Sequence, residues 1–330
     1  DIVRSAINAA KDRPLSHFSR APYGKRVNMK VLITGASGFI GTALSEELRR
    51  VGHEPVPLLR GAPRPGARTW TVDGNRIDDD ALDGIDAVVH LAGAPIGPWL
   101  NEVKRTEIMQ SRRDGTRLIA EAVAEAKPTV FVSASGKDYY GEAGDTELTE
   151  SSPKGTGFLT DVVEVWERET RPAVDAGVRT VMLRTGLVID SSGGLMTTTL
   201  FGIPGVNLLL PFKLGVGGPF GSGRQWWSWI SLEDEVRAIV HCLETDSVEG
   251  PVNLTAPEPV RHRAFARELG RVLNRPAVFP LPAFALKAIV GPQFAEEAIL
   301  VSNKVLPAKL QDSGFEFSHP DLGSALESTF

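Results

Sequence analysis

The residues best suited to chemistry lie in a glycine-rich loop, TGASGFIG at positions 34–41. An apolar, β-rich run at Lys30–Thr34 precedes the loop, and a helical pattern at Gly41–Val51 follows it. In a loop of this kind the first glycine permits a tight turn, the second lets the backbone approach a pyrophosphate, and the third allows the helix to pack closely on the strand. The start of the helix offers free N–H groups and a positive dipole end to phosphates. We therefore expect a dinucleotide to contact Gly35, Ser37, Gly38, Phe39, Ile40 and Gly41.

The residue after the second predicted strand indicates which dinucleotide this is. That strand, Glu54–Leu59, is followed by Arg60 and has no acidic residue at its end. An acid there would bind the free ribose hydroxyl of NAD, whereas an arginine accommodates the 2′-phosphate of NADP. We therefore predict NADP(H) as the cofactor. The alternative is that Arg60 is a solvated arginine after a strand.

Alternating strands and helices must position this loop. This alternation is typical of an α/β fold with a doubly wound parallel sheet, the Rossmann type. The predicted strands are Lys30–Thr34, Glu54–Leu59, Thr69–Val72, Ala87–Leu91, Thr129–Ser133, Arg179–Arg184 and Pro251–Leu254, and the predicted helices are Gly41–Val51, Val103–Ala126, Asp161–Ala176 and Leu232–Glu244.

The pattern changes after residue 189, where glycine, proline and aromatic residues become frequent. We predict an NADP-binding domain at 29–189, to which 230–256 returns. A smaller, mixed C-terminal substrate lobe is predicted from 190–229 and 257–330. Residues 1–28 are interpreted as an N-terminal extension, with the tail of an upstream domain as one explanation.

Composition excludes several classes of protein. The net charge of -5 gives no basic field for nucleic acid or an anionic membrane. The single cysteine, Cys242, excludes internal disulfides and predicts a cytoplasmic location, and it is interpreted as a small helix residue. The six histidines show no metal-ligand spacing. No apolar run is long enough to span a bilayer. We expect no metal, no nucleic-acid partner and no membrane partner.

Eight sequence blocks together resemble a known family. They are TGASGFIG (34–41), HLAGAPI (90–96), SRRDGT (111–116), SASGKDYYG (133–141), LRTGLV (183–188), GGPFGSGRQWWSWISLED (217–234), NLTAP (253–257) and LPAKLQDSGF (306–315). The set resembles the atypical extended short-chain dehydrogenases/reductases called epimerase family proteins, or nucleoside-diphosphate-sugar epimerase-like proteins. The resemblance covers the chain from Met29 onward.

The resemblance implies further cofactor contacts. Leu59 and Arg60 would meet the adenosine ribose phosphate. Beyond the fourth strand, the cofactor would be lined by Leu91, Ala92 and Gly93. Glu107, Arg112 and Arg184 would lie near the cofactor or its mouth. Other interpretations are strand-end packing for Leu91 and Ala92, a solvated helix pair for Glu107 and Arg112, and a strand-end salt bridge for Arg184.

The acid/base pair of ordinary superfamily members, Tyr-x-x-x-Lys, is absent. By the resemblance it would fall in the segment 157–167, GFLTDVVEVWE, which contains neither tyrosine nor lysine. Its spacing puts both side chains on one helix face, where the lysine favours tyrosinate. The three tyrosines are Tyr23, Tyr139 and Tyr140, and the residues four positions later are Val27, Ala143 and Gly144. The other candidates near the fifth strand are Ser133, Ser135, Lys137 and Asp138. By position in the superfamily, Ser135 would orient the substrate and Tyr140 is the candidate proton-transfer group, although it would need a lowered pKa to act as a base. A packing role is the alternative for Tyr140.

The glycine- and tryptophan-rich block at 217–234 predicts the substrate side. Arg224 and Gln225 lie inside it and could pair with a substrate phosphate. The alternative is a turn whose tryptophans, Trp226 and Trp227, pack the two lobes together.

Two functions are compatible with these features. The first is an NADP(H)-binding epimerase- or reductase-like oxidoreductase or isomerase acting on a small-molecule substrate, with a nucleotide sugar as one candidate. The second is an NADP(H)-binding sensor or interaction protein without catalysis, because the Tyr-x-x-x-Lys pair is missing. Neither predicts an oligomeric state.

Overall fold

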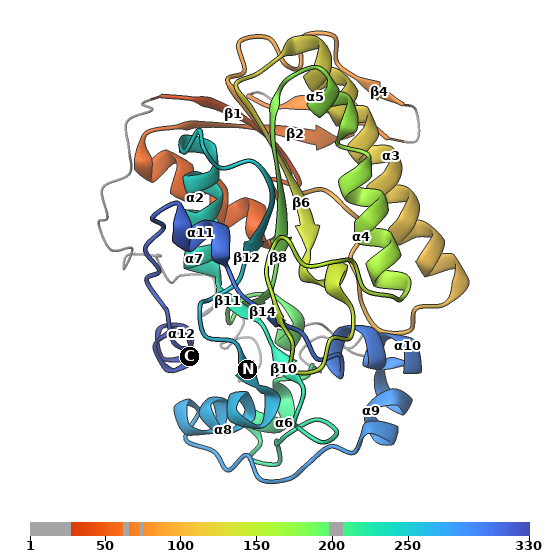
Figure 1. Cartoon of the computed structure of the whole chain (residues 1–330), viewed down its shortest axis with the longest axis vertical. Coiled ribbons are helices and arrows are strands. Elements are labelled where there is room, and N and C mark those ends of the chain that lie inside the picture. The colour runs from red at the N-terminus through yellow and green to blue at the C-terminus, as the bar shows by residue number, and fades with distance from the viewer. Residues whose placement is uncertain (1–27, 62–65, 73–74, 198–206) are drawn as a thin grey trace, which may run out of the picture.

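The computed structural model describes residues 28–61, 66–72, 75–197 and 207–330 (Figure 1). The extension predicted at 1–28 lies outside these residues apart from Asn28. A sheet of eight strands runs through the described residues. In spatial order the strands are β12 (Gly250–Leu254), β8 (Arg179–Thr185), β6 (Val130–Gly136), β5 (Ala87–His90), β1 (Lys30–Thr34), β2 (Glu54–Arg60), β3 (Arg68–Thr71) and β4 (Arg76–Ile77).

All neighbouring strands of this sheet are parallel except β3 and β4, which are antiparallel. The chain moves outward from β1 through β2 in one direction and from β5 in the other. The carboxyl ends of β1 and β5 therefore form the switch point where ligands bind in open α/β sheets. The prediction of a doubly wound parallel sheet is confirmed.

Helices cover both faces because side chains of β1 alternate between them. Val31 and Ile33 pack in the core beneath α2 (Phe39–Val51) and α7 (Leu232–Glu244), and Leu32 packs in the core beneath α3 (Glu102–Ala126). Two further helices, α4 (Phe158–Arg168) and α5 (Arg171–Asp175), pack against α3. The predicted helix Asp161–Ala176 is thus two helices. Pro172 lacks a backbone N–H donor and so breaks the helix before it.

A second core lies below the sheet in Figure 1. It is built on aromatic side chains, including the fully buried Trp229, Phe212 and Phe265. The helices around it are α6 (Leu210–Lys213), α8 (His262–Val272), α9 (Ala283–Val290), α10 (Pro292–Phe294) and α12 (Leu322–Thr329). The short elements of the connections are β7 (Glu147–Leu148), β9 (Leu187–Ile189), β10 (Trp226–Trp227), β11 (Trp229–Ser231), β13 (Val260–Arg261), β14 (Lys304–Val305), η1 (Lys137–Tyr140), η2 (Leu195–Thr197), η3 (Ala295–Ile299) and α11 (Ala308–Asp312).

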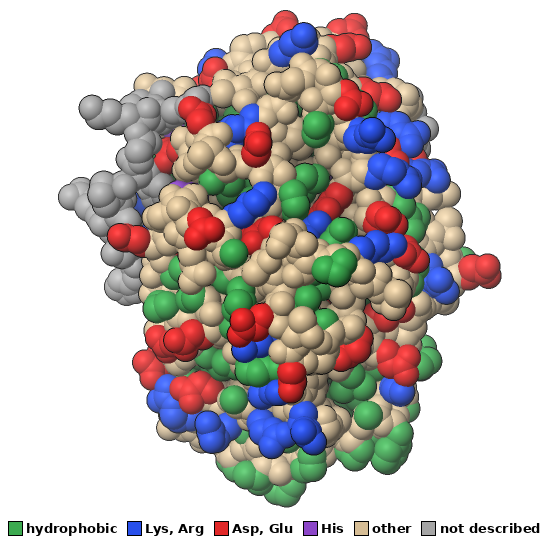
Figure 2. All heavy atoms as spheres, viewed as in Figure 1, with side chains coloured by type: hydrophobic (Ala, Val, Ile, Leu, Met, Phe, Trp, Pro, Cys, Tyr) green, Lys and Arg blue, Asp and Glu red, His purple; other side chains and the backbone are tan. Residues whose placement is uncertain are grey.

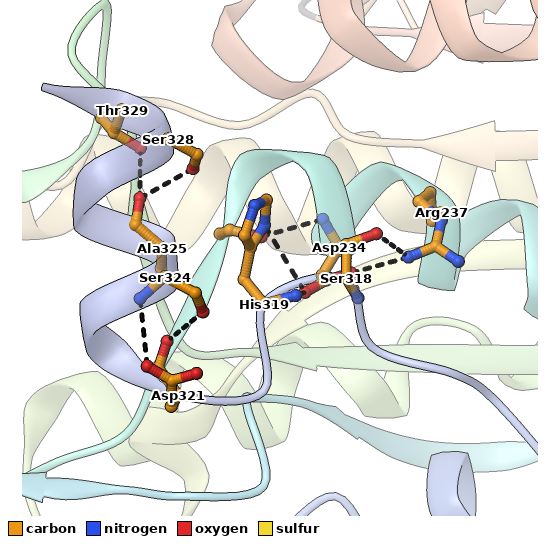
Figure 3. A network of polar contacts seen from close by, with 10 residues as sticks. Asp234, Arg237, Ser318, His319, Asp321, Ser324, Ala325, Ser328 and Thr329 are labelled. Atoms are coloured by element: carbon orange, nitrogen blue, oxygen red, sulfur yellow. Dashed lines mark hydrogen bonds and ion pairs between the residues drawn. The ribbon is translucent and has the colours of Figure 1, made fainter. Parts of the chain in front are cut away.

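The C-terminal segment returns to the sheet before it ends in the lobe. Leu310 and Phe315 lie in the core of the sheet, although the sequence prediction assigned 257–330 to the lobe. Figure 3 shows how the next residues are held: the Asp234 carboxylate accepts the backbone N–H groups of Ser318 and His319, each at 2.8 Å, and also pairs with Arg237 at 2.9 Å. Among the described residues, no helix is both long enough and apolar enough to cross a bilayer.

Candidate functional site

The switch point is held by a buried hydrogen-bond chain between β1 and β5. The Thr34 hydroxyl accepts the N–H groups of Leu91 and Ala92, at 3.1 and 3.2 Å, and lies 2.7 Å from His90 Nδ1. Its proton therefore points to Nδ1, and Nε2 of His90 donates to Thr116 at 3.1 Å. Burial, followed by the charge of Arg112, lowers the pKa of His90 to about 3, so the ring is neutral. This chain fixes the backbone on which a cofactor would lie.

The glycine loop is shaped by close backbone approaches. Gly35 has a φ of 70°, and a Cβ there would lie 3.0 Å from the backbone nitrogen of Ala92. A Cβ on Gly41 would lie 2.2 Å from the Gly35 carbonyl oxygen, so only glycine allows α2 to start this close to the loop. The backbone requires glycine at both positions, as predicted for a dinucleotide loop.

The N-terminus of α2 is open to a ligand. Ser37 and Gly38 are exposed, and Phe39 and Ile40 are half-buried. Gly38 is the N-cap, and among the described residues no side chain caps the helix there. The first turn also carries no acidic residue. Free N–H groups and a positive dipole end therefore face outward, which suits a pyrophosphate.

The other predicted cofactor residues lie on the same edge of the sheet. Arg60 ends β2 and is exposed, Leu59 beside it is half-buried, and Leu91 and Ala92 are half-buried after β5. Gly93 is exposed. The structure thus brings the glycine loop, Arg60 and the 91–93 segment to the carboxyl ends of β1, β2 and β5.

Arg112 and Glu107 have different surroundings although both lie on α3. Glu107 is solvated, with its side chain 54% exposed and paired with Lys104 at 2.9 Å. Arg112 is only 6% exposed, donates to the Ala94 carbonyl at 3.0 Å and lies 4.5 Å over the Trp166 ring. Its Nε atom has no partner among the described residues, and burial lowers its pKa to about 10. The alternative of a solvated Glu107–Arg112 pair is therefore wrong for Arg112.

A second group of polar side chains lies behind the carboxyl ends of β6 and β8. We call it the Ser135 cluster, and its members are Ser135, Tyr140, Glu167, Arg184 and Asn253. The Glu167 carboxylate receives Nε and Nη2 of Arg184, each at 2.8 Å, and the Ser135 hydroxyl at 2.7 Å. Arg184 also donates to the Tyr140 hydroxyl at 3.0 Å, and that hydroxyl donates to Asn253 Oδ1 at 2.7 Å.

The cluster is buried and its members satisfy one another. Arg184 is 3% exposed, and its guanidinium also lies 3.5 Å over the Tyr139 ring. Burial alone would lower the pKa of Arg184, but the hydrogen bonds and charge of Glu167 raise it. The strand-end salt bridge considered for Arg184 is present. A role of Arg184 at the cofactor stays a prediction, because all three nitrogens of its guanidinium donate inside the cluster.

Tyr140 has few of the properties of a base in this position. It is 2% exposed, and burial raises its pKa above the ordinary value even though Arg184 and Asn253 act in the opposite direction. Its hydroxyl already donates once and accepts once. The packing role considered for Tyr140 is what these contacts show, and its role in proton transfer stays a prediction.

Glu167 and Asn253 were missed in the sequence. Glu167 lies on α4, in the segment where Tyr-x-x-x-Lys would fall, directly after the buried Trp166. The available signal was an acidic residue bordering the apolar face of that helix. The other predicted polar residues of this region, Lys137 and Asp138, form a half-buried ion pair of 3.0 Å.

The two residues predicted on the substrate side, Arg224 and Gln225, have different surroundings. Arg224 is exposed, whereas Gln225 is buried and its amide nitrogen donates to the Phe220 carbonyl at 3.1 Å. Trp227 is buried against His262 and Phe265, so it packs inside the C-terminal lobe and not between the two lobes. A cavity of about 330 Å³ lies elsewhere, and neither Arg224 nor Gln225 lines it. Its polar lining includes Asp138, Glu142, Thr156, Thr160, Glu296 and Glu297.

Metal binding and thiol chemistry have little support in the part of the chain that is described. No group of three or more His, Cys, Asp or Glu side chains there could hold a metal ion. Cys242 is fully buried in α7, and burial raises its pKa to about 12. The thiol therefore stays protonated and unreactive.

The fold and the glycine loop define a Rossmann-type protein of the extended short-chain dehydrogenase/reductase kind. The model of the NAD dependent epimerase/dehydratase family matches residues 31–158, and a domain of unknown function (DUF1731) matches 281–329. "Epimerase family protein Mb2239" of Mycobacterium bovis is 38% identical over 302 residues, which cover 91% of this chain and 97% of the relative. The chain therefore belongs to the epimerase family proteins.

Two solved structures support the assignment to the epimerase family proteins. The crystal structure of human epimerase family protein SDR39U1 with NADPH has a TM-score of 0.81 and 36% identity, covering 91% of this chain and 98% of the human one. The nucleoside-diphosphate sugar epimerase of Corynebacterium glutamicum has a TM-score of 0.73 and 33% identity, covering 92% of this chain and 59% of that one.

Proposed function

We propose that this protein binds NADP(H) at the carboxyl ends of β1, β2 and β5 and acts as an oxidoreductase or isomerase on a small molecule. The observation that carries the proposal is the open N-terminus of α2 next to a loop whose backbone requires glycine at Gly35 and Gly41. The NADPH in the human relative's crystal structure supports the choice of cofactor.

The chain's own residues fit this cofactor. The first-turn N–H groups of α2 would hold the pyrophosphate, and the exposed Arg60 would pair with the 2′-phosphate. Leu91, Ala92 and Gly93 would line the path toward β6. The unpartnered Nε of the buried Arg112 lies beside this path, because the Arg112 guanidinium is 3.4 Å from the position of a Cβ on Gly93. A buried cation with a free donor suits an anionic or carbonyl group of a ligand.

The chemistry would centre on Ser135. When bound, NADP(H) supplies or accepts a hydride. Ser135 donates its proton to Glu167, so its oxygen presents lone pairs to a ligand. It would therefore orient a substrate hydroxyl, which is a donor, rather than a carbonyl, which is an acceptor. A nucleotide sugar has such hydroxyls and is one substrate class to test.

The direct test is a fluorescence titration of the purified chain with NADPH and NADH. We expect NADPH to bind more tightly, and Arg60→Glu to lower the NADPH affinity by at least about tenfold while NADH changes little. Arg49→Glu is the matched control, since Arg49 is exposed at the other end of α2. Equal binding of the two cofactors, or equal effects of the two variants, would contradict Arg60 as the selector.

A second function, cofactor-dependent sensing without catalysis, is favoured by one observation: the Tyr140 hydroxyl is buried and already paired on both sides. Turnover of a panel of nucleotide sugars and carbonyl compounds by the NADP(H)-loaded protein separates the two functions. If turnover survives in Tyr140→Phe, the reaction does not need the Tyr140 hydroxyl for proton transfer. Silence across the panel, with NADPH demonstrably bound, would favour sensing.

A further inference from the structure

The lobe ends in a cluster of exposed apolar side chains. Phe279 is 56% exposed and Phe284 is 77% exposed, and Leu214, Val216 and Val278 are also exposed. We call these five residues the apolar tip. Large apolar side chains gathered on a surface mark interaction sites far more often than single exposed ones do.

The tip is one surface because two segments run side by side there. The N–H of Phe279 donates to the Gly217 carbonyl at 3.1 Å, and the N–H of Leu281 donates to the Pro219 carbonyl at 2.9 Å. Phe284 follows at the start of α9. In Figure 1 the connection from α8 to α9 forms the lower end of the molecule along its longest axis. The tip is therefore a projection of the molecule and not a groove.

Cationic side chains border the tip. Lys213 and Arg275 lie in the two segments that form the tip, and Arg267 lies on the neighbouring α8. All three are exposed, and within the described chain none of them has an ion-pair partner. Arg275 Nε donates to the Lys213 carbonyl at 3.2 Å, which joins two of them beside Leu214. Figure 2 shows Lys and Arg side chains over α8 and hydrophobic side chains below them.

The acidic residues of this region are compensated. Glu296 is paired with Lys287 at 2.5 Å, and Glu268 on α8 shares Arg271 with Glu327 on α12, at 2.7 and 2.5 Å. The two segments that form the tip, 207–219 and 274–287, contain no acidic residue of their own. The tip and its border therefore carry a local positive charge, although the chain as a whole is negative. We expected no membrane partner because of the net charge of the whole chain, and that argument does not apply to a local patch of positive charge.

We propose that the apolar tip docks on an anionic lipid surface, with Phe279 and Phe284 entering the headgroup region and Lys213, Arg267 and Arg275 contacting lipid phosphates or carboxylates. A projecting apolar tip with a cationic border fits a flat, soft, negatively charged surface. A second copy of the chain fits less well, because a two-fold contact through the tip would place the same cations opposite one another.

The test is co-sedimentation of the full chain with phosphatidylcholine vesicles, with and without phosphatidylserine. We expect binding to the anionic vesicles, weakened by added salt. The double variant Phe279→Ser/Phe284→Ser should lower the partition coefficient by at least about tenfold. Lys213→Glu/Arg275→Glu should lower it by about tenfold on anionic vesicles.

Matched controls separate docking from loss of the fold. Val103→Ser/Val174→Ser removes exposed apolar side chains from α3 and α5, and Arg49→Glu/Lys127→Glu reverses charges away from the lobe; both should bind vesicles like the wild type. All variants should keep the wild-type thermal midpoint.

Three results would overturn the proposal. The first is no binding to anionic vesicles, and the second is equal loss of binding in the control variants. The third is a concentration-dependent dimer in sedimentation velocity that Phe279→Ser/Phe284→Ser abolishes, which would assign the tip to a second copy.

Discussion

The carboxyl ends of the sheet differ sharply between β1–β2 and β6–β8. At β1 and β2 the residues Ser37, Gly38 and Arg60 are exposed, and no side chain caps the first turn of α2. At β6 and β8 the Ser135 cluster is buried, and its charged and hydroxyl groups bind one another. The first region presents its donors at the surface, and the polar groups of the second region bind one another within the chain.

This difference shows which residues occupy the region where other superfamily members have Tyr-x-x-x-Lys. A tyrosine and lysine on α4 would present a titratable pair to the cofactor. Here α4 instead supplies Glu167, whose charge is neutralised by Arg184. Ser135 and Arg184 both bind the Glu167 carboxylate, so the polar groups of this region hold one another in place. A contact of Ser135 with a ligand stays a proposal.

The largest expected effect is on the closed side. Glu167→Gln leaves the buried Arg184 charge without a carboxylate, and breaking such a pair costs about 3–5 kcal/mol in the free energy of unfolding. Glu164→Gln on the same helix, where the side chain is 52% exposed, should cost less than about 1 kcal/mol. Urea unfolding of both variants checks this. Equal costs would mean that the cluster does not stabilise the fold.

A buried acid of α7, which contacts β8 at Thr185, gives the second prediction. Glu235 accepts the Thr185 hydroxyl at 2.8 Å, its other oxygen has no partner among the described residues, and burial raises its pKa to about 8. In the folded state it keeps its proton, whereas in the unfolded state it loses it above its ordinary pKa. Its contribution to stability is therefore fully present below that ordinary pKa and is lost as the pH rises toward 8.

We expect Glu235→Gln to remove this loss. The slope is about 1.4 kcal/mol per pH unit, so the wild type should lose about 2 kcal/mol relative to the variant between roughly pH 6 and 7.5. Thermal or urea unfolding at several pH values measures the difference in unfolding free energy between wild type and Glu235→Gln. Titratable groups that both proteins share, such as His90, contribute equally to both and cancel in this difference. Glu233→Gln, in the same turn of α7, is the control. Parallel stability curves for wild type and Glu235→Gln would show that Glu235 is ionised in the fold.

The smallest expected effect is on the open side. Gly41→Ala places a Cβ 2.2 Å from the Gly35 carbonyl, so the loop must shift and the cofactor affinity should fall at least about tenfold. Gly115→Ala on α3 puts its Cβ 3.7 Å from the Trp70 ring, an ordinary contact, and should leave the affinity unchanged. NADPH titration of the two variants would sharpen the comparison, because unchanged affinity in Gly41→Ala would show that the loop tolerates a side chain.

The sequence predicted the open side well because its physics is local. A strand, three glycines and a helix are contiguous, so their spacing specifies both the turn and the free N–H groups. The alternation of apolar runs likewise predicted each parallel strand of the eight-stranded sheet, but not the short parallel strands β7, β9 and β11 outside it. The break between α4 and α5 was missed, although Pro172 carried the signal.

The closed side could not be predicted because its contacts join distant parts of the chain. Tyr140 and Asn253 are 113 residues apart, and Ser135 and Glu167 are 32 apart. Spacing along the sequence places Ser135 and Arg184 at strand ends, but only the register of β6 and β8 sets them opposite one another. The burial of Arg112 and Gln225 depends on packing in the same way.

The measurement that tests the comparison most directly is amide hydrogen exchange of the whole chain with and without NADPH. We predict that NADPH slows exchange in the peptides covering 35–41 and 91–94. The peptides covering η1, α4 and β12 should be protected already and change little. The opposite pattern, with an unaffected glycine loop and a large change around Ser135 and Tyr140, would contradict an open cofactor site beside a closed cluster.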